Sequence, residues 1–202
     1  NTSITDSLVD GVFSSGNHYQ TPFTAHLKSD SDAPLASGNQ AVWTQVPIGY
    51  AGKDLLGNPA EWVWSASDSA VHVLSVMGSW CPNCMDEVRL LAGVHRQSAR
   101  FISIAFERDT LAAAAYRRLD EFASEMNMDW EVYLGGRASK GIAADAFPFL
   151  DRVLSFPTTL FIQNNTVVVH SGFNGPATGE RYELERERFN NQLKGVTSLE
   201  SH

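Results

Sequence analysis

The sequence predicts an α/β fold, a mixed central β-sheet flanked by helices, with a β-hairpin extension at the N-terminus. Short apolar runs rich in β-branched residues alternate along the chain with segments that have helical spacing. Near the C-terminus, two such apolar runs follow each other across a tight turn, as in an antiparallel hairpin. This order of elements is typical of an α/β sandwich whose sheet contains both parallel and antiparallel strands.

The N-terminal part of the chain differs in composition from the rest. Residues 28–40, KSDSDAPLASGNQ, are rich in Ser, Asp, Gly and Pro, which indicates a linker or a long loop. Before them, two strand-like runs flank a turn at Ser15-Gly16-Asn17, and such a hairpin is marginally stable alone. We therefore expect an N-terminal extension with its linker over residues 1–40 and one α/β domain over residues 41–202.

The elements of the α/β domain follow from its hydrophobic spacing. Strand patterns occupy residues 72–77, 101–106, 130–134, 158–162 and 166–171. Helical spacing covers residues of about 82–97, 110–126, 139–152 and 179–193. Thr110 is the expected N-cap of the second helix, and Pro148 is expected to disturb the third. Because a helix connects the first two strands, they should lie side by side and parallel.

Composition and charge exclude several classes of protein. Fifteen Lys and Arg residues against 23 Asp and Glu residues give a net charge of −8, and no basic run exceeds two residues. These features argue against a nucleic-acid surface and against an anchor for anionic membranes. No apolar stretch is long enough to span a bilayer. Since the chain starts at Asn1 with no leader pattern, we expect a processed or trimmed product, its signal peptide or lipid anchor removed.

Both cysteines of the chain lie in the segment GSWCPNC, at Cys81 and Cys84. They suit a metal site, a structural disulfide or a redox centre. A structural zinc site needs about four ligands, and the six histidines include no closely spaced pair. A disulfide across two intervening residues closes a very small loop and restricts the unfolded chain little. The spacing therefore favours a disulfide-exchange centre.

The placement of the two cysteines supports the same interpretation. Pro82 fits the first turn of the following helix, where its missing N–H group costs nothing. Cys81 then lies at the helix N-terminus, where the dipole and the unpaired N–H groups favour a thiolate. Cys84 shares a helical face with Val88 and Leu91 and is expected to point inward. The sequence thus predicts one exposed, activated sulfur and one sheltered sulfur.

Several motifs resemble those of a known superfamily. The segment VLSVMGSWCPNC resembles the active-site strand, Trp-Cys-x-x-Cys motif and helix of the thioredoxin superfamily. More narrowly, GSWCPNCMDE, IAFERD, SFPTTLFI and GFNGPATGERY resemble the periplasmic TlpA-type thiol–disulfide oxidoreductases. The resemblance spans residues of about 50–195 and implies a thioredoxin-like sandwich, with no metal or other cofactor. It also implies that the residues before the linker are the last strands of an amino-terminal β-domain.

The resemblance implies a catalytic set of Cys81 as nucleophile, Cys84 as resolving thiol and Glu107 as proton acceptor. Ser75 stands where thioredoxin carries a buried Asp, so another group has to accept the proton of Cys84. Glu107, in IAFERD, matches a glutamate that TlpA-type proteins place near the end of the strand that follows the active-site helix. The alternative for Glu107 is a solvated strand end paired with Arg108.

The resemblance also implies a substrate-binding surface around the dithiol. Its expected members are Trp80, Pro82, Asn83, Phe156 and Pro157, with Pro157 as a cis-proline that faces the cysteines. The alternative for Trp80 and Phe156 is packing in the core. The dipeptide Pro82-Asn83 differs from the Gly-Pro of thioredoxin, so the reduction potential of thioredoxin does not transfer to this chain.

Acidic residues follow the cysteines at Asp86 and Glu87, in the first turns of the same helix. Carboxylates near a helix N-terminus interact favourably with the helix dipole. Their charges would also oppose formation of a thiolate, and we expect both residues to stabilise the helix.

The expected function is thiol–disulfide exchange with protein thiols and disulfides, in the direction of a reductase. The resemblance implies a membrane thiol–disulfide protein as electron donor and a periplasmic or otherwise exported location, and having no further cysteine suits an oxidising compartment. One alternative is a thioredoxin-fold thiol peroxidase, but such enzymes carry a Thr where this chain has Gly78. The other alternative is a non-catalytic binding module of the same fold.

Overall fold

A computed structural model describes most of the chain as helices, strands and connecting turns. The described residues are 3–5, 8–15, 19–26, 39–43, 48–64, 70–94, 99–109, 111–150, 153, 155–164, 166–175 and 179–194. The chain divides into two compact units, Asn1–Ser37 and Gly38–His202. The boundary falls at residue 37 because Asn39 and Gln40 pair with His170 and Val169 in the sheet of the second unit.

The first unit is a small antiparallel sheet of three strands. They are β1 (Ser3–Thr5), β2 (Leu8–Ser15) and β3 (Tyr19–His26), in the order β1-β2-β3. The β2–β3 pair confirms the predicted hairpin, with Leu8 opposite His26 and Ser15 opposite Tyr19. The predicted turn at residues 16–17 lies outside the described residues. Strand β1 was not predicted, because three residues are too few for a hydrophobic pattern.

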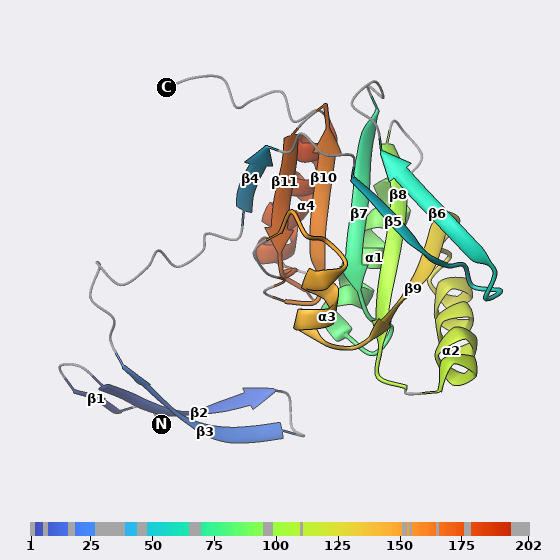
Figure 1. Cartoon of the computed structure of the whole chain (residues 1–202). Coiled ribbons are helices and arrows are strands. Elements are labelled where there is room, and N and C mark those ends of the chain that lie inside the picture. The colour runs from blue at the N-terminus through green and yellow to red at the C-terminus, as the bar shows by residue number, and fades with distance from the viewer. Residues whose placement is uncertain are drawn as a thin grey trace. The chain divides into compact units, whose positions relative to one another are not determined.

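The second unit is built on an eight-stranded mixed sheet, in the order β4-β11-β10-β7-β8-β9-β5-β6 (Figure 1). Its strands are β4 (Asn39–Trp43), β5 (Ile48–Lys53), β6 (Pro59–Trp64), β7 (Val71–Met77), β8 (Ala99–Glu107), β9 (Glu131–Arg137), β10 (Thr158–Gln163) and β11 (Thr166–Ser171). The β7–β8 and β8–β9 pairs are parallel and the other neighbouring pairs are antiparallel. The prediction of a mixed sheet with β7 and β8 parallel neighbours is confirmed.

Helices cover both faces of this sheet. They are α1 (Pro82–Val94), α2 (Ala112–Glu125), α3 (Lys140–Asp145) and α4 (Glu180–Leu193). In Figure 1, α1 and α4 lie behind the sheet and α3 lies in front of it. The buried side chains agree with this arrangement, since Leu91 of α1 and Phe189 of α4 share one apolar cluster with Val73 and Phe161. Burial of this apolar area is the main stabilising term for the fold.

The structure differs from the sequence prediction in the segments that carry weak patterns. Strands β4, β5 and β6 were not predicted. The N-cap position of helix α2 is Leu111, whose side chain makes no capping hydrogen bond, and the expected N-cap Thr110 lies outside the described residues. Helix α3 ends at Asp145, well before residue 152, because Pro148 cannot continue it.

Candidate active site

Cys81 lies in the turn between the end of β7 and the start of α1, and Cys84 lies in the first turn of α1. The N–H group of Cys81 donates to the carbonyl oxygen of Gly78 at 3.1 Å, which closes the turn. A Cβ atom on Gly78 would lie 2.4 Å from Nε1 of Trp80 and 2.9 Å from the carbonyl oxygen of Phe106. Only glycine therefore lets the Trp80 indole fold back over the turn, where its Nε1–H group donates to Phe106 O at 2.8 Å.

The two thiols are free and differ in their surroundings. Cys84 is fully buried, on the inward face of α1 with Val88 and Leu91, as the helical spacing predicts. Cys81 is only 5% exposed, so the expected exposed sulfur is wrong in degree. Its Sγ atom accepts the N–H group of Cys84 and donates to the carbonyl oxygen of Phe156, each at 3.4 Å.

The electrostatics of the two thiols diverge. A hydrogen bond from the Cys84 thiol lowers the pKa of Cys81 to about 7. The N–H groups of Cys84 and Asn83 lower this pKa too, whereas burial opposes them. Burial, the adjacent Cys81 sulfur and the charge of Glu87 all raise the pKa of Cys84 well above its ordinary value. At neutral pH a substantial fraction of Cys81 is therefore thiolate, while Cys84 stays a protonated thiol.

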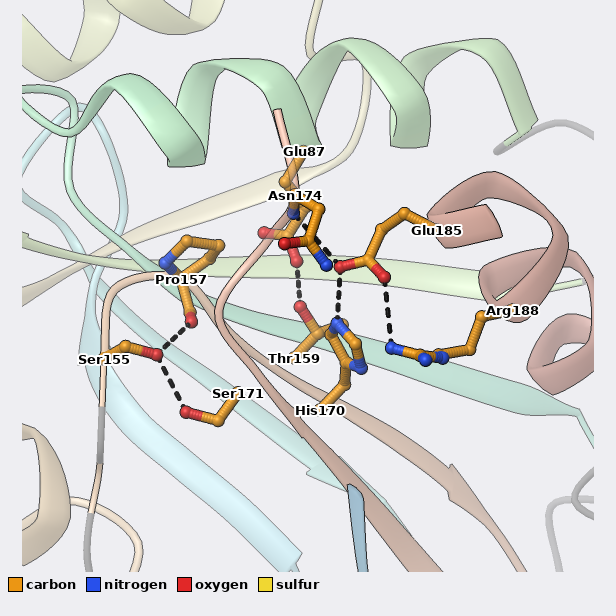
Figure 2. A network of polar contacts seen from close by, with 9 residues as sticks. All are labelled: Glu87, Ser155, Pro157, Thr159, His170, Ser171, Asn174, Glu185 and Arg188. Atoms are coloured by element: carbon orange, nitrogen blue, oxygen red, sulfur yellow. Dashed lines mark hydrogen bonds and ion pairs between the residues drawn. The ribbon is translucent and has the colours of Figure 1, made fainter. Parts of the chain in front are cut away.

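Glu87 is a buried carboxyl group whose charge raises the pKa of both thiols, which agrees with the expectation that it opposes thiolate formation. It is 0% exposed, and its side chain lies between α1 and the sheet (Figure 2). Ser75 donates to Oε2 at 2.7 Å, and Thr159 donates to Oε1. Burial raises the pKa of Glu87 to about 7, although these two hydrogen bonds and the charge of His170 lower it.

Ser75, which stands where thioredoxin carries a buried Asp, has the Glu87 carboxyl group as its hydrogen-bond partner. The buried Asp of thioredoxin stands on the strand, whereas here the carboxyl group descends from α1 onto the Ser75 hydroxyl. One signal in the sequence pointed to it, because Glu87 is three residues after Cys84 and thus on the same inward face as Val88.

Glu107 is also buried, at 1% exposure, and takes part in the turn that carries the cysteines. Its Oε1 atom accepts the N–H group of Ser79 at 2.8 Å and its Oε2 atom accepts the Ser79 hydroxyl at 2.8 Å. The alternative of a solvated strand end paired with Arg108 is wrong, since Arg108 lies 4.1 Å above the Trp80 ring. Glu107 fixes the residues just before Cys81.

The predicted substrate-binding residues surround Cys81. Pro82 and Asn83 are exposed at the start of α1. Trp80 and Phe156 are half-buried and meet edge to face, with ring centroids 5.6 Å apart. Pro157 is buried, and its peptide bond with Phe156 is cis. Trp80 and Phe156 also pack against the core cluster that contains both cysteines.

Two further features of the described residues concern membranes and metals. None of the described helices is both long and apolar enough to cross a membrane. Among the same residues, no group of three or more His, Cys, Asp or Glu side chains is placed to hold a metal ion.

Comparisons with known proteins identify the fold. No protein-family model and no curated protein sequence matches the chain. Among solved structures, a secreted thiol–disulfide isomerase from Corynebacterium glutamicum aligns with a TM-score of 0.52 and 13% identity, over 81% of this chain and 96% of that one. The DsbF protein of Mycobacterium tuberculosis aligns with a TM-score of 0.51 and 14% identity, over 72% of this chain and 92% of that one. The chain therefore has the thioredoxin-like fold.

Proposed function

We propose that this protein is a thiol–disulfide oxidoreductase in which Cys81 is the nucleophile and Cys84 the resolving thiol. One observation carries the proposal: a cysteine whose pKa is lowered to about 7 adjoins a cysteine whose pKa is raised. Exchange chemistry needs this asymmetry, because one thiol must attack first and the other must wait for the mixed disulfide. The two aligned structures support it, since one is a secreted thiol–disulfide isomerase and the other, DsbF, has mixed oxidised and reduced forms.

The first step is the attack of the Cys81 thiolate on a substrate disulfide. The new bond joins Cys81 Sγ to one substrate sulfur, and the other substrate sulfur leaves as a thiolate that takes a proton from water. Trp80 and Phe156 meet edge to face and pack against the cluster that contains Cys81. We propose that these rings, with Pro82, Asn83 and Pro157, contact the segment of the substrate around its disulfide.

The second step is resolution by Cys84. Its thiol loses a proton and attacks Cys81 Sγ, so that the Cys81–Cys84 disulfide forms and the second substrate sulfur leaves as a thiolate. Two electrons pass from the protein dithiol to the substrate disulfide. We propose Glu87 in place of Glu107 as the acceptor of the Cys84 proton, since Glu87 lies on the same helical face and its charge acts on both thiols.

A pKa of about 7 suits Glu87 to this task. A base with a pKa near the working pH is available in its ionised form and still holds the proton that it receives. Glu107 supports the same chemistry by a different route, since it holds Ser79 and thereby the turn before Cys81.

The physiological setting is part of the proposal. We propose that the protein acts as a reductase on protein disulfides in the periplasm or another exported compartment. A membrane thiol–disulfide protein would then reduce the Cys81–Cys84 disulfide after each turnover. Anchoring through a segment that precedes this chain fits the same setting.

Reduction of insulin disulfides by dithiothreitol tests the proposal. The wild-type chain should accelerate the reaction, and Cys81→Ser should abolish the acceleration. Cys84→Ser should instead accumulate a covalent mixed disulfide with the substrate, visible by mass spectrometry. Insulin binding without any acceleration would indicate the non-catalytic binding module. Peroxide turnover with a thiol reductant, without insulin reduction, would indicate the peroxidase.

A further inference from the structure

A row of polar side chains crosses the apolar face of the sheet beneath α1 and α4. Thr159 of β10 pairs in register with Ser75 of β7 on one side and with His170 of β11 on the other. Residues paired in this way project to the same face of a sheet. All three are buried, with exposures of 0%, 1% and 4% respectively. The row leads from the neighbourhood of the dithiol towards α4.

Each of the two helices above the row sends one carboxylate onto it (Figure 2). Glu87 of α1 accepts hydrogen bonds from Ser75 and Thr159. Glu185 of α4 is 1% exposed, and its Oε1 atom lies 2.9 Å from Nε2 of His170. Two buried acidic groups and one buried imidazole thus share a strip of the core that is otherwise uncharged.

The Glu185 carboxyl group is held in its ionised form. Burial raises the pKa of Glu185. The hydrogen bond and charge of His170, the N–H group of Asn174 at 3.2 Å and the guanidinium of Arg188 at 3.2 Å lower it by more, so the pKa lies below its ordinary value. A carboxylate can only accept hydrogen bonds, so Nε2 of His170 carries a proton and donates it.

We propose that the His170–Glu185 pair positions and tunes Glu87, so that the pair sets the pH range in which Cys84 resolves the mixed disulfide. The proposal rests on the function proposed above. His170 stands next to Thr159 in the row, and Thr159 donates to Glu87, so the imidazole is one residue removed from the carboxyl group that accepts the proton.

The sign of the tuning follows from the groups that face Glu87. Cys84 faces Glu87 from its own helix, and the Cys81 sulfur faces it from the turn before that helix. His170 faces it from β11, and Glu185 with its partner Arg188 faces it from α4. Strands β7 and β10 contribute the uncharged Ser75 and Thr159. An imidazolium charge favours the Glu87 carboxylate, and the charge of Glu185 opposes it. In this account Glu185 mainly positions the imidazole, through its 2.9 Å contact with Nε2 of His170.

The test compares His170→Gln with Arg186→Gln. Both changes remove a basic group, but Arg186 pairs with Glu183 on the exposed side of α4, away from the row. The pKa of Glu87 is measured by carbon-13 NMR of its carboxyl carbon in the reduced protein, assigned with Glu87→Gln. We expect His170→Gln to raise this pKa by roughly 0.5–1.5 pH units and Arg186→Gln to leave it unchanged. Equal values in both variants would overturn the proposal.

The reaction of the reduced protein with Ellman's reagent gives the second readout. Attack by Cys81 releases one aromatic thiolate, and resolution by Cys84 releases the other, so two phases separate the steps. At pH 7, a shift of about one pKa unit should slow the second phase by about fivefold in His170→Gln and leave the first within about twofold. A changed NMR titration with an unchanged second phase would overturn the link to resolution. If neither phase appears in the wild type, the proposed function fails and the NMR titration alone decides the coupling.

A second variant controls for destabilisation of the fold by a Glu185 carboxylate that has lost its His170 partner. The double change His170→Gln with Glu185→Gln keeps a hydrogen-bonded pair and removes both charges. Because the charge of His170 acts on Glu87 more strongly than that of Glu185, we expect an upward shift that is smaller than in the single variant. A downward shift would contradict the assigned roles.

Discussion

Replacing Glu87 with Gln should make the folded protein less sensitive to alkaline pH. The folded-state pKa of Glu87 is raised above its unfolded value, so its contribution to stability is fully present below the unfolded pKa and is lost as the pH rises through about 7. The reason is physical: the carboxylate form leaves water for a site with two hydroxyl partners and an apolar surround. Gln keeps the shape of the protonated side chain and does not ionise.

The magnitude follows from the same pKa. The difference between about 7 and the ordinary value of 4.5 corresponds to about 3 kcal/mol, at about 1.36 kcal/mol for each pKa unit. Part of this loss of folding stability is already present at pH 5, where the Glu87 carboxyl group of the unfolded chain is largely ionised. Between pH 5 and pH 8.5, we therefore expect the variant to gain roughly 2–3 kcal/mol in free energy of unfolding relative to the parent.

The assay is urea denaturation at both pH values in a Cys81→Ser background, which removes a thiol that also titrates near neutral pH. Glu183→Gln is the matched control, because Glu183 is 54% exposed in its ion pair on α4 and should show no pH-dependent gain. A gain for Glu87→Gln no larger than that of the control would refute the claim that the buried carboxyl group ionises near neutral pH.

Two further predictions concern the turn that holds the thiols. Iodoacetamide should alkylate Cys81 of the reduced protein at a rate that rises with pH and has its inflection at about pH 7, and it should leave Cys84 largely unmodified. Peptide mapping identifies the modified cysteine, and faster modification of Cys84 would reverse the assigned roles. Gly78→Ala should lower the free energy of unfolding by about 1–3 kcal/mol, measured by chemical denaturation, because the added Cβ atom would meet the Trp80 indole. The control Gly93→Ala on α1 adds a Cβ atom that meets nothing within 4 Å, and it should stabilise the protein by up to about 1 kcal/mol. An equal effect of the two alanines would show that the indole does not lie over the turn.

The central part of the fold could be predicted from the sequence because its signals are local. Strands β7 and β8 are mainly apolar runs, and α1 joins them, which requires a parallel crossover. The edge strands could not be predicted in the same way. Strand β5, with the sequence IGYAGK, contains two glycines and pairs with β9 through Lys53 and Leu134, so its place depends on distant partners.

In the candidate site, too, local patterns were predictable and contacts between distant segments were not. The spacing of Cys84, Val88 and Leu91 is enough to turn the resolving thiol inward. The role of Glu87 escaped prediction because an acidic residue near a helix N-terminus has a sufficient local explanation in the helix dipole. Its burial results from Ser75 and Thr159, on two strands far apart in the sequence. The pairing of His170 with Glu185 likewise depends on the docking of α4 against β11, which no local pattern encodes.

A redox titration of the Cys81–Cys84 couple against a dithiothreitol or glutathione series tests the central claim most directly. The account predicts one two-electron transition, followed by alkylation of free thiols and mass spectrometry, in which both thiols disappear together. A potential near −270 mV, about that of thioredoxin, would agree with the proposed reductase, and one near −120 mV would indicate an oxidant. Thiols that stay free throughout the oxidising range would contradict the proposal that this pair exchanges disulfides.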